Sequence, residues 1–337
     1  MRHVDYARVL RPLLPAEAFR PAPQKMLPAA AHCAVVLVTW TAFRFAPPLL
    51  YPILALVAGH SLACLALAAH EVSHGAVLRQ KLAARCLETV LWTLNWIPAT
   101  MWRRLHNQSH HAQTNSLNDP DRRYLAKERA VSTWLYTLLF CPNRFLRRNP
   151  LALTHFLTYV VRQEIAVFLP GAMKPRINSF KPDYTPQDRW RIGAEIASIA
   201  IAQVGVFFMV GGWARWLWAG PAAIAVDSCV MMAYIFTNHF LNPIGEGDDP
   251  LAATTSVVVP KIVDRLHFNF SHHAEHHLFP SANSAYYPQM SRLLQAHFPE
   301  RYNRLRFGEA WRRLSQLDLF VDGPMPPTPS LQAQPAE

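Results

Sequence analysis

Residues 49–74 read LLYPILALVAGHSLACLALAAHEVSH. The apolar run from Leu49 to Ala69 is close to the ~20 residues that an α-helix needs to cross the hydrocarbon core of a bilayer. It continues directly into His70 and His74, which are four positions apart and therefore share one face of a helical turn. This stretch predicts a membrane protein whose polar chemistry lies where a span reaches the membrane surface.

The composition of the chain supports the same prediction. Of its 337 residues, 51% are hydrophobic and 16% are charged, against roughly 25% charged in soluble domains. The five cysteines form no Cys-x-x-Cys pair, so neither a thiolate zinc site nor a disulfide framework is expected. The net charge of +11 indicates either nucleic-acid binding or the basic cytoplasmic loops of a membrane protein.

Four apolar runs are long enough to cross a bilayer, and they form two hairpins. Pro47-Pro48 joins the first pair and Gly211-Gly212 joins the second. Two shorter apolar segments, 86–102 and 151–170, are expected at the membrane interface or against the polar domain, because crossing would separate the histidine clusters. The predicted spans are residues 28–45, 49–69, 192–211 and 216–237.

The basic residues test this topology. Of the 33 lysines and arginines, 31 fall in segments 1–27, 70–191 and 240–337, while Arg44 and Arg215 lie at the two turns. This one-sided distribution follows the positive-inside tendency, so it accounts for the net charge and removes the reason to expect nucleic-acid binding. It places both termini in the cytoplasm, at the cell inner membrane if the source is bacterial.

The expected fold class is therefore an all-α integral membrane protein. Its four transmembrane helices form two hairpins, capped by a cytoplasmic helical domain that carries the histidine boxes. Residues 1–27 are expected to form a basic cytoplasmic arm and residues 28–315 the membrane domain. The Pro- and Gln-rich residues 316–337 are expected to form a disordered tail.

Two further histidine clusters follow the first, at residues 106–111 and 272–277. In an α-helix, His106 and His110 would share a face, with His111 turned by about 100° from His110. Histidines at i, i+3 and i+4 in the last cluster would likewise lie along one face. Imidazoles this dense indicate a metal site, since each neutral ring has a donor and an acceptor to satisfy.

Together with His239, at the end of the fourth apolar run, the clusters supply nine candidate metal ligands. A metal ion uses roughly four to six ligands, so nine imidazoles favour two ions. Nitrogen ligands without thiolate suit iron, copper, nickel or zinc. The nine candidates are His70, His74, His106, His110, His111, His239, His273, His276 and His277.

Acidic or amide groups are expected to hydrogen-bond the outward ring nitrogens of such ligands. Asp227 lies inside an apolar span, where a carboxylate is costly and usually functional, although a hydrogen bond between helices would explain it equally well. His272 is expected either to support a ligand in this way or to lie at the surface. The candidates closest to the clusters in sequence are Glu71, Asp119, Asp227, Asn238, Asn269 and Glu275.

The boxes resemble those of the membrane fatty acid desaturase family, over roughly residues 30–315. The matching motifs are His70-x3-His74, His106-x3-His110-His111 and His273-x2-His276-His277, the last continuing as Leu-Phe-Pro. The order of the boxes and the hydrophobic hairpin between them also match. His239 stands where the family uses a histidine near the end of the fourth span.

The resemblance implies a non-haem diiron enzyme that uses two iron ions, with O2 as co-substrate, to introduce a double bond into an acyl chain. Whether a lipid, coenzyme A or acyl carrier protein carries that chain stays open. The sequence has no ferredoxin cysteine pattern, flavin fingerprint or His-Pro-Gly-Gly motif. Electrons are therefore expected from an external donor of the ferredoxin or cytochrome b5 type with its reductase.

Three other interpretations stay open at this point. Hydroxylases, ketolases and alkane monooxygenases share the boxes, and the ligands do not distinguish oxygen insertion from loss of a second hydrogen. Residues 70–74 also satisfy the H-E-x-x-H pattern of zinc metalloproteases, which leaves the other boxes without a role. A metal transporter would place histidines along its spans, where only His32, His60 and His239 are found.

Overall fold

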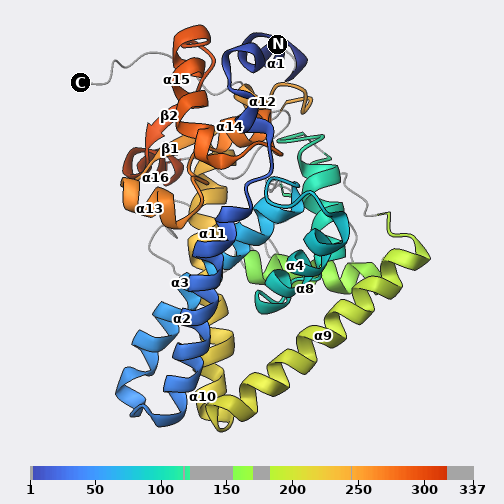
Figure 1. The fold of residues 1–337 in the computed structure, drawn as a ribbon, viewed down its shortest axis with the longest axis vertical. Helices are drawn as coiled ribbons and strands as arrows, with labels where there is room; N and C mark the ends of the chain where they lie inside the picture. Colours follow the sequence, from blue (N-terminus) through green and yellow to red (C-terminus); the bar gives the residue numbers. More distant parts are fainter. Residues whose placement is uncertain (1–2, 117, 122–154, 170–182, 244, 317–337) are drawn as a thin grey trace.

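The computed structural model describes residues 3–116, 118–121, 155–169, 183–243 and 245–316 (Figure 1). Within these residues, four helical stretches are long and apolar enough to cross a membrane by length and composition, which agrees with the four predicted spans. They contain helices α2 (Met26–Phe45), α3 (Tyr51–Ser73), α9 (Pro186–Val210), α10 (Trp213–Leu217) and α11 (Ala223–His239).

Helix α3 is the centre of the bundle. It packs along both α2 and α11, whereas α9 contacts α2 and α10 and runs diagonally away from the bundle (Figure 1). In the most apolar part of α3, 67% of the residues are buried, whereas in α9 only 11% are. Helix α9 therefore presents an almost entirely apolar, uncovered surface. Gly59 lets α3 and α11 approach closely, because a Cβ there would lie 2.5 Å from the Cβ of Val226.

Proline and glycine residues shape both hairpins. The first turn follows α2 at Pro47, and the second uses Gly211 and Gly212, whose φ angles of 86° and 117° lie in the left-handed region. Before α11, the chain winds as a π-helical turn, Trp218–Ala222, that contains Pro221. Proline has no N–H to donate, so the α-helical hydrogen-bond ladder cannot continue through this position.

The two shorter apolar segments form helices beside the spans. Helix α4 (Lys81–Leu94) packs on α3 and α9 and is followed by the single turn α5 (Ala99–Trp102), while α8 (His155–Phe168) packs on α11. Helices α4 and α8 each have 14 residues. Such a helix is about 21 Å long, short of the ~30 Å hydrocarbon core. Neither described helix is therefore long enough by itself to be a span.

A polar domain lies at one end of the bundle (Figure 1). The prediction of an all-helical protein missed its two short strands, β1 (Ser256–Val258) and β2 (Arg304–Arg306), which pair in parallel with Ser256 beside Arg304. Strands of three residues are too short to show alternation in the sequence. The helices of this domain are α12 (Pro250–Ala253), α13 (Lys261–Leu266), α14 (His273–Leu278), α15 (Tyr287–His297) and α16 (Phe307–Leu314).

The basic N-terminal segment packs on this domain. Its helix α1 (His3–Leu10) contacts α14 and α15, and the N-terminus lies at the same end of the molecule as these helices (Figure 1). The ring of His3 reaches the carbonyl of Leu278 at 2.6 Å, and the Tyr6 hydroxyl donates to Asp249 at 3.0 Å. The predicted disordered tail beyond residue 316 lies outside the described residues.

Candidate metal centre

The first box is the C-terminal turn of α3. His70 is 1% exposed, and the His74 amide still donates to the His70 carbonyl at 3.2 Å, so helical geometry extends through both histidines. The adjacent Glu71 points away from the rings and forms a buried ion pair with Lys25 from the N-terminal segment. A carboxylate held by a lysine is poorly placed to act as the general base of a metalloprotease.

The second box lies on a π-helical segment, Arg103–His110. The amide of His111 donates to the carbonyl of His106 at 3.2 Å, an i to i+5 bond. This wider turn brings His111 above His106, whereas an α-helix would have paired His106 with His110. His106 and His111 therefore join one group of ligand atoms and His110 joins another, although ligand atoms of His106 and His110 also lie close to each other and to Asp121.

The third box forms α14, and β1 positions it. The Ser256 hydroxyl accepts a hydrogen bond from the Ala274 amide at 3.0 Å and donates to Glu275 at 2.6 Å. Before α14 the chain reverses through Phe268 and Asn269, whose φ angles are 55° and 58°. Only the bonds of a fixed fold hold a bulky aromatic residue in this left-handed region.

The structure brings all nine predicted histidines together in two groups of converging ligand atoms. Within each group every ligand atom lies within 4.8 Å of the others. We call them group A and group B. Group A contains His70, His74, His106, His111 and His276, and group B contains His110, His239, His273 and His277.

The distances in group A cannot all be ordinary hydrogen bonds. The Nε2 atom of His106 lies 2.9 Å from that of His70 and 3.2 Å from that of His111. The Nε2 atom of His111 also lies 3.1 Å from that of His276. A neutral imidazole has one N–H, so one proton on His111 cannot serve both contacts. Lone pairs directed at a common cation explain all three contacts, since nitrogens about 2.0–2.1 Å from a metal lie roughly 2.9–3.4 Å apart.

The contacts in group B likewise cannot all be ordinary hydrogen bonds. The Nε2 atom of His273 lies 2.7 Å from that of His239 and 3.1 Å from that of His277. Several buried ring nitrogens across the two groups have no hydrogen-bond partner among the described residues. Except for His74 Nε2 they are Nδ1 atoms, the outward nitrogens of rings whose Nε2 atoms converge, so a metal at the Nε2 atoms would leave them free for supporting hydrogen bonds. The unpaired atoms include His74 Nε2 and the Nδ1 atoms of His70, His106, His111, His239 and His273.

Burial keeps most of these rings neutral, as ligands must be. Loss of solvation, followed by repulsion from neighbouring histidines, lowers the pKa of the box histidines beyond the spans well below its usual value, with one exception. Burial also opposes charge on His110, but Asp119 and Asp121 outweigh it and raise its pKa to about 9. Without a metal His110 therefore keeps both ring protons, and a metal at Nε2 would displace one of them and leave the Nδ1 proton facing Asp119.

Three side chains hold ring nitrogens on the outside of the groups. Asp119 lies 2.9 Å from His110 Nδ1 and accepts the Asn115 amide at 2.7 Å. The hydroxyls of Thr114 and Tyr287 each lie 3.2 Å from a ring Nδ1 atom, that of His277 and His276 respectively. Asp119 was a candidate from the sequence. Thr114 and Tyr287 were not, because nothing about a lone hydroxyl marks it as the partner of a distant histidine.

Other predicted supporting residues contact different partners. Glu275 lies 3.3 Å from His272 Nδ1 and accepts hydrogen bonds from Ser256 and Tyr302, so His272 has a place beside a carboxylate rather than in either group. The Asn269 amide donates to the carbonyl of Ser284 at 3.0 Å. Asn238 is buried beside His239, and its side chain has no partner among the described residues.

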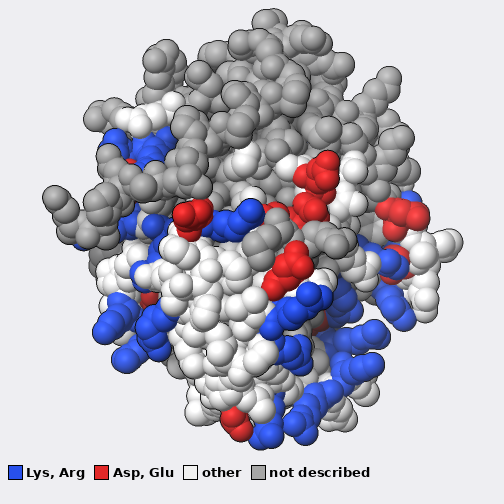
Figure 2. Space-filling model, turned by 90° about the horizontal axis from the view of Figure 1, so that it is seen from above, with Lys and Arg blue, Asp and Glu red and all other residues white. Residues whose placement is uncertain are grey.

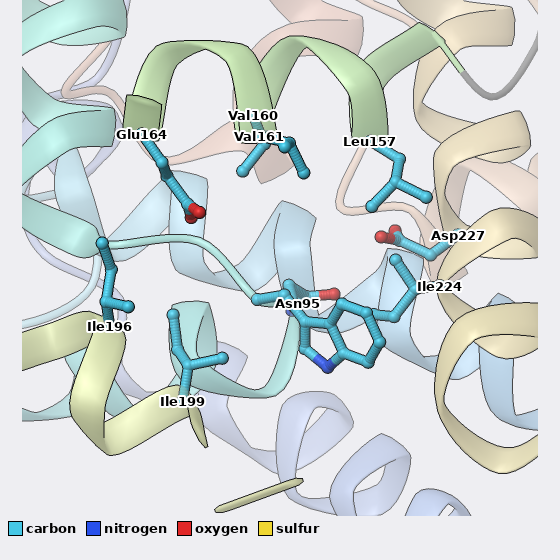
Figure 3. Close-up of a pocket in the computed structure, with 10 residues that line it drawn as sticks. Asn95, Leu157, Val160, Val161, Glu164, Ile196, Ile199, Ile224 and Asp227 are labelled. Carbon is cyan, nitrogen blue, oxygen red and sulfur yellow. The ribbon is translucent and has the colours of Figure 1, made fainter. Parts of the chain in front are cut away.

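Asp227 lies apart from the histidines and lines a pocket (Figure 3). It precedes His239 on α11 by roughly 18 Å of helical rise. The pocket has a volume of about 120 Å³, and the carboxylates of Asp227 and Glu164 both point into it (Figure 3). Burial raises the pKa of Glu164 to about 7. The lining residues are Asn95, Trp96, Leu157, Val160, Val161, Glu164, Ile196, Ile199, Ile224 and Asp227.

Comparison with known proteins covers the same region. A family model described as fatty acid desaturase matches residues 46–308, which include all nine histidines. An acyl-lipid (7-3)-desaturase from Diacronema lutheri is 24% identical over an alignment of 259 residues that covers 68% of this chain. The chain spans about half of that relative, 53% of its length.

Proposed function

The chain belongs to the fatty acid desaturase family, and we propose that it introduces a double bond into an acyl chain in an O2-dependent reaction at two iron ions. The observation that carries the proposal is the division of nine histidines, seven of them buried and two partly buried, into two adjacent groups of ligand atoms. A single ion would leave half of these imidazoles without a role. Two ions, one in each group, give every ring a partner.

Group A supplies five nitrogen ligands to one iron and group B supplies four to the other. Iron accepts imidazole nitrogen, and no cysteine belongs to either group. When bound, the iron pair supplies the O2 activation needed to break two unactivated C–H bonds. The overall change converts –CH2–CH2– to –CH=CH–. Two electrons and two protons from the substrate, with two electrons from the donor and two protons from solvent, reduce O2 to two waters.

The surrounding side chains exclude water from this reaction. The Phe270 ring packs against His70 and His273, with centroids 5.2 and 5.0 Å apart. The indole of Trp102 stacks on His106 at 4.8 Å with an interplanar angle of 15°. These contacts cover the apolar side of the histidine groups, where an acyl chain would approach. Keeping water out and holding the chain still is the protein's part in such chemistry.

The pocket beside Asp227 is a candidate for the part of the substrate remote from the reacting carbons. Its walls are mostly isoleucine, valine and leucine, which suit a hydrocarbon chain. It lies along the bundle from the histidine groups, in the direction that a chain entering the membrane region would take. The depth of such a pocket limits the length of chain that can be accommodated. The pocket does not determine whether a lipid, coenzyme A or acyl carrier protein carries that chain.

The membrane orientation and the electron donor are part of the proposal. Both histidine groups and the N-terminal segment lie at one end of the molecule, which we place in the cytoplasm with both termini. Seen from that end, basic side chains gather at the left and the lower right of the described surface, with acidic side chains between them (Figure 2). Such a surface suits an acidic electron carrier of the ferredoxin or cytochrome b5 type. It also suits anionic lipid headgroups, which attract basic residues near a membrane.

Anaerobic purification, iron quantitation and product analysis with a reductase system test the proposal together. We expect about two irons per chain, loss of iron in His273→Ala and His106→Ala, and a lipid product two mass units lighter than its substrate. A product sixteen units heavier would show hydroxylation instead. One zinc per chain, with no iron under conditions that load other diiron proteins, would refute the assignment.

A further inference from the structure

A third set of metal-ligand side chains lies outside groups A and B. His60 and Cys64 stand four positions apart on α3 and share a face of that helix, and His267 follows the end of α13. Their ligand atoms all lie within 4.8 Å of one another. We propose that His60, Cys64 and His267 bind a single divalent ion of the zinc class, separately from the two ions of the proposed function.

The geometry of the two imidazoles fits such an ion. The Nε2 atoms of His60 and His267 are 3.1 Å apart, and the Cys64 Sγ lies 4.0 Å from the other ring nitrogen of His60. Zinc bound at about 2.0–2.1 Å from nitrogen and 2.3 Å from sulfur places nitrogens roughly 3.3 Å apart and sulfur roughly 3.6 Å from each of them. The two Nε2 atoms already have this spacing, and the Cys64 sulfur lies within 4.8 Å of a ring nitrogen of each histidine.

A hydroxyl group contacts His267 at the ring nitrogen that does not face His60. The Tyr234 hydroxyl lies 2.8 Å from His267 Nδ1, and both residues are buried. A hydrogen bond to one ring nitrogen orients a histidine and directs the other nitrogen at a metal. Burial, followed by His60 and His32, lowers the pKa of His267 to about 4, so its imidazole is neutral near pH 7. A neutral ring is the form that binds metal.

The position of His60 argues for a function. It lies in the middle of an apolar span, where a polar side chain is costly and usually has a role. The cysteines looked too scattered in sequence for a thiolate site, and the fold changes this by bringing His267, which follows α13, against His60 on α3. A bound ion would tie these two elements together. Since α13 leads through Phe268 and Asn269 into the third box, the tie would steady the approach to α14.

The competing arrangement is a metal-free row of hydrogen bonds. Tyr234 would donate to His267, His267 to His60, and His60 to the Cys64 sulfur. This row uses the same distances but needs no thiolate. The ionisation state and metal contact of Cys64 therefore distinguish the two arrangements.

Cobalt substitution provides the test. Iron-loaded protein in detergent is treated with Co2+, and the near-ultraviolet absorption of a thiolate-to-cobalt bond is recorded with the bound cobalt. Groups A and B contain no cysteine, so cobalt exchanged into them gives no such band. We expect one cobalt per chain with the band in the wild type and in Cys229→Ser, a matched control on α11. The band should be lost in Cys64→Ser and strongly reduced in His267→Gln.

Iron content and elution as a single species show that each variant is folded. If Cys64→Ser fails these checks, His267→Gln and His60→Gln carry the test. Absence of the band in wild-type protein would overturn the proposal in favour of the hydrogen-bonded row. A band that survives Cys64→Ser would overturn it by assigning the thiolate to another cysteine. Neither result affects the two-iron proposal, because iron content is measured independently.

Discussion

Replacing Asp119 with asparagine should weaken iron binding about ten- to hundredfold while leaving the fold in place. The carboxylate lies 2.9 Å from His110 Nδ1, with both side chains almost completely buried, and it also accepts the Asn115 amide. Asparagine has the same shape as aspartate, and its amide oxygen can still accept a hydrogen bond from His110. That hydrogen bond is no longer made to a charged group. Charged hydrogen bonds contribute about 1.5–3 kcal/mol and neutral ones about 0.5–1.5.

The difference, about 1–2 kcal/mol, corresponds to a loss of roughly tenfold or somewhat more in affinity. The weaker hydrogen bond also makes His110 a less basic ligand, which lowers the iron affinity further. Loss of a hydrogen-bond partner of a metal ligand typically lowers metal affinity 10–100-fold. Iron affinity is measured by competition with a chelator under anaerobic conditions, on protein whose folding is checked by thermal unfolding of the metal-free form. The iron of group B should be lost first.

The matched control is Asp188→Asn. This buried carboxylate accepts hydrogen bonds from Thr185 and Arg104 at the start of α9, and it contacts no box histidine. The variant should lose stability through a weakened helix cap, about 0.5–2 kcal/mol, and keep its iron affinity. Wild-type affinity in Asp119→Asn, or an equal loss in both variants, would refute the role assigned to Asp119.

Three further outcomes follow from the structure. Ile199→Trp should fill the pocket and shorten the acyl chains accepted in a competition assay, whereas Ile201→Trp, on an exposed part of α9, should leave chain selection unchanged. Gly59→Ala should destabilise the bundle by about 1–3 kcal/mol through overpacking against α11, and Gly205→Ala, which meets open space, should not; equal melting temperatures would contradict this. Metal-free protein should lose stability as the pH falls from about 8 to about 5, because an unfolded histidine takes up a proton near pH 6.5 and buried His267 does so only near pH 4. His267 alone accounts for about 2 kcal/mol of this loss, and stability that is constant or rises on acidification would contradict it.

The local patterns of the sequence were sufficient to find the nine histidines that the structure brings together. Each box is a short spacing of histidines, and each span is a length of apolar residues, so both are readable without knowledge of the fold. Asp119 was also found, because it lies near His110 in sequence and is joined to it through a local turn. Closeness in sequence failed for Asp227, whose side chain lines the pocket, and for Asn269, whose side chain holds Ser284.

The division of the histidines between the two groups depended on backbone geometry that the spacing did not reveal. His106 and His111 fall in one group because the second box is π-helical, and a standard helical repeat would have paired His106 with His110. In the third box, His276 joins group A while His273 and His277 join group B, since α14 lies between the two. Periodicity predicts one face of a helix for all three histidines of the third box. In the structure they are directed to two groups on different sides of α14.

The sequence by itself determined the four apolar spans, the nine histidines and the family resemblance, because hydrophobic length and short motifs are properties of consecutive residues. The tertiary structure alone decided which histidines fall in the same group, that Tyr287 and Thr114 lie beside them, and that His267 meets His60 on α3. These are contacts between residues distant in the chain. They form only when burial of apolar surface between helices brings separate segments together, and no spacing along the chain encodes that approach.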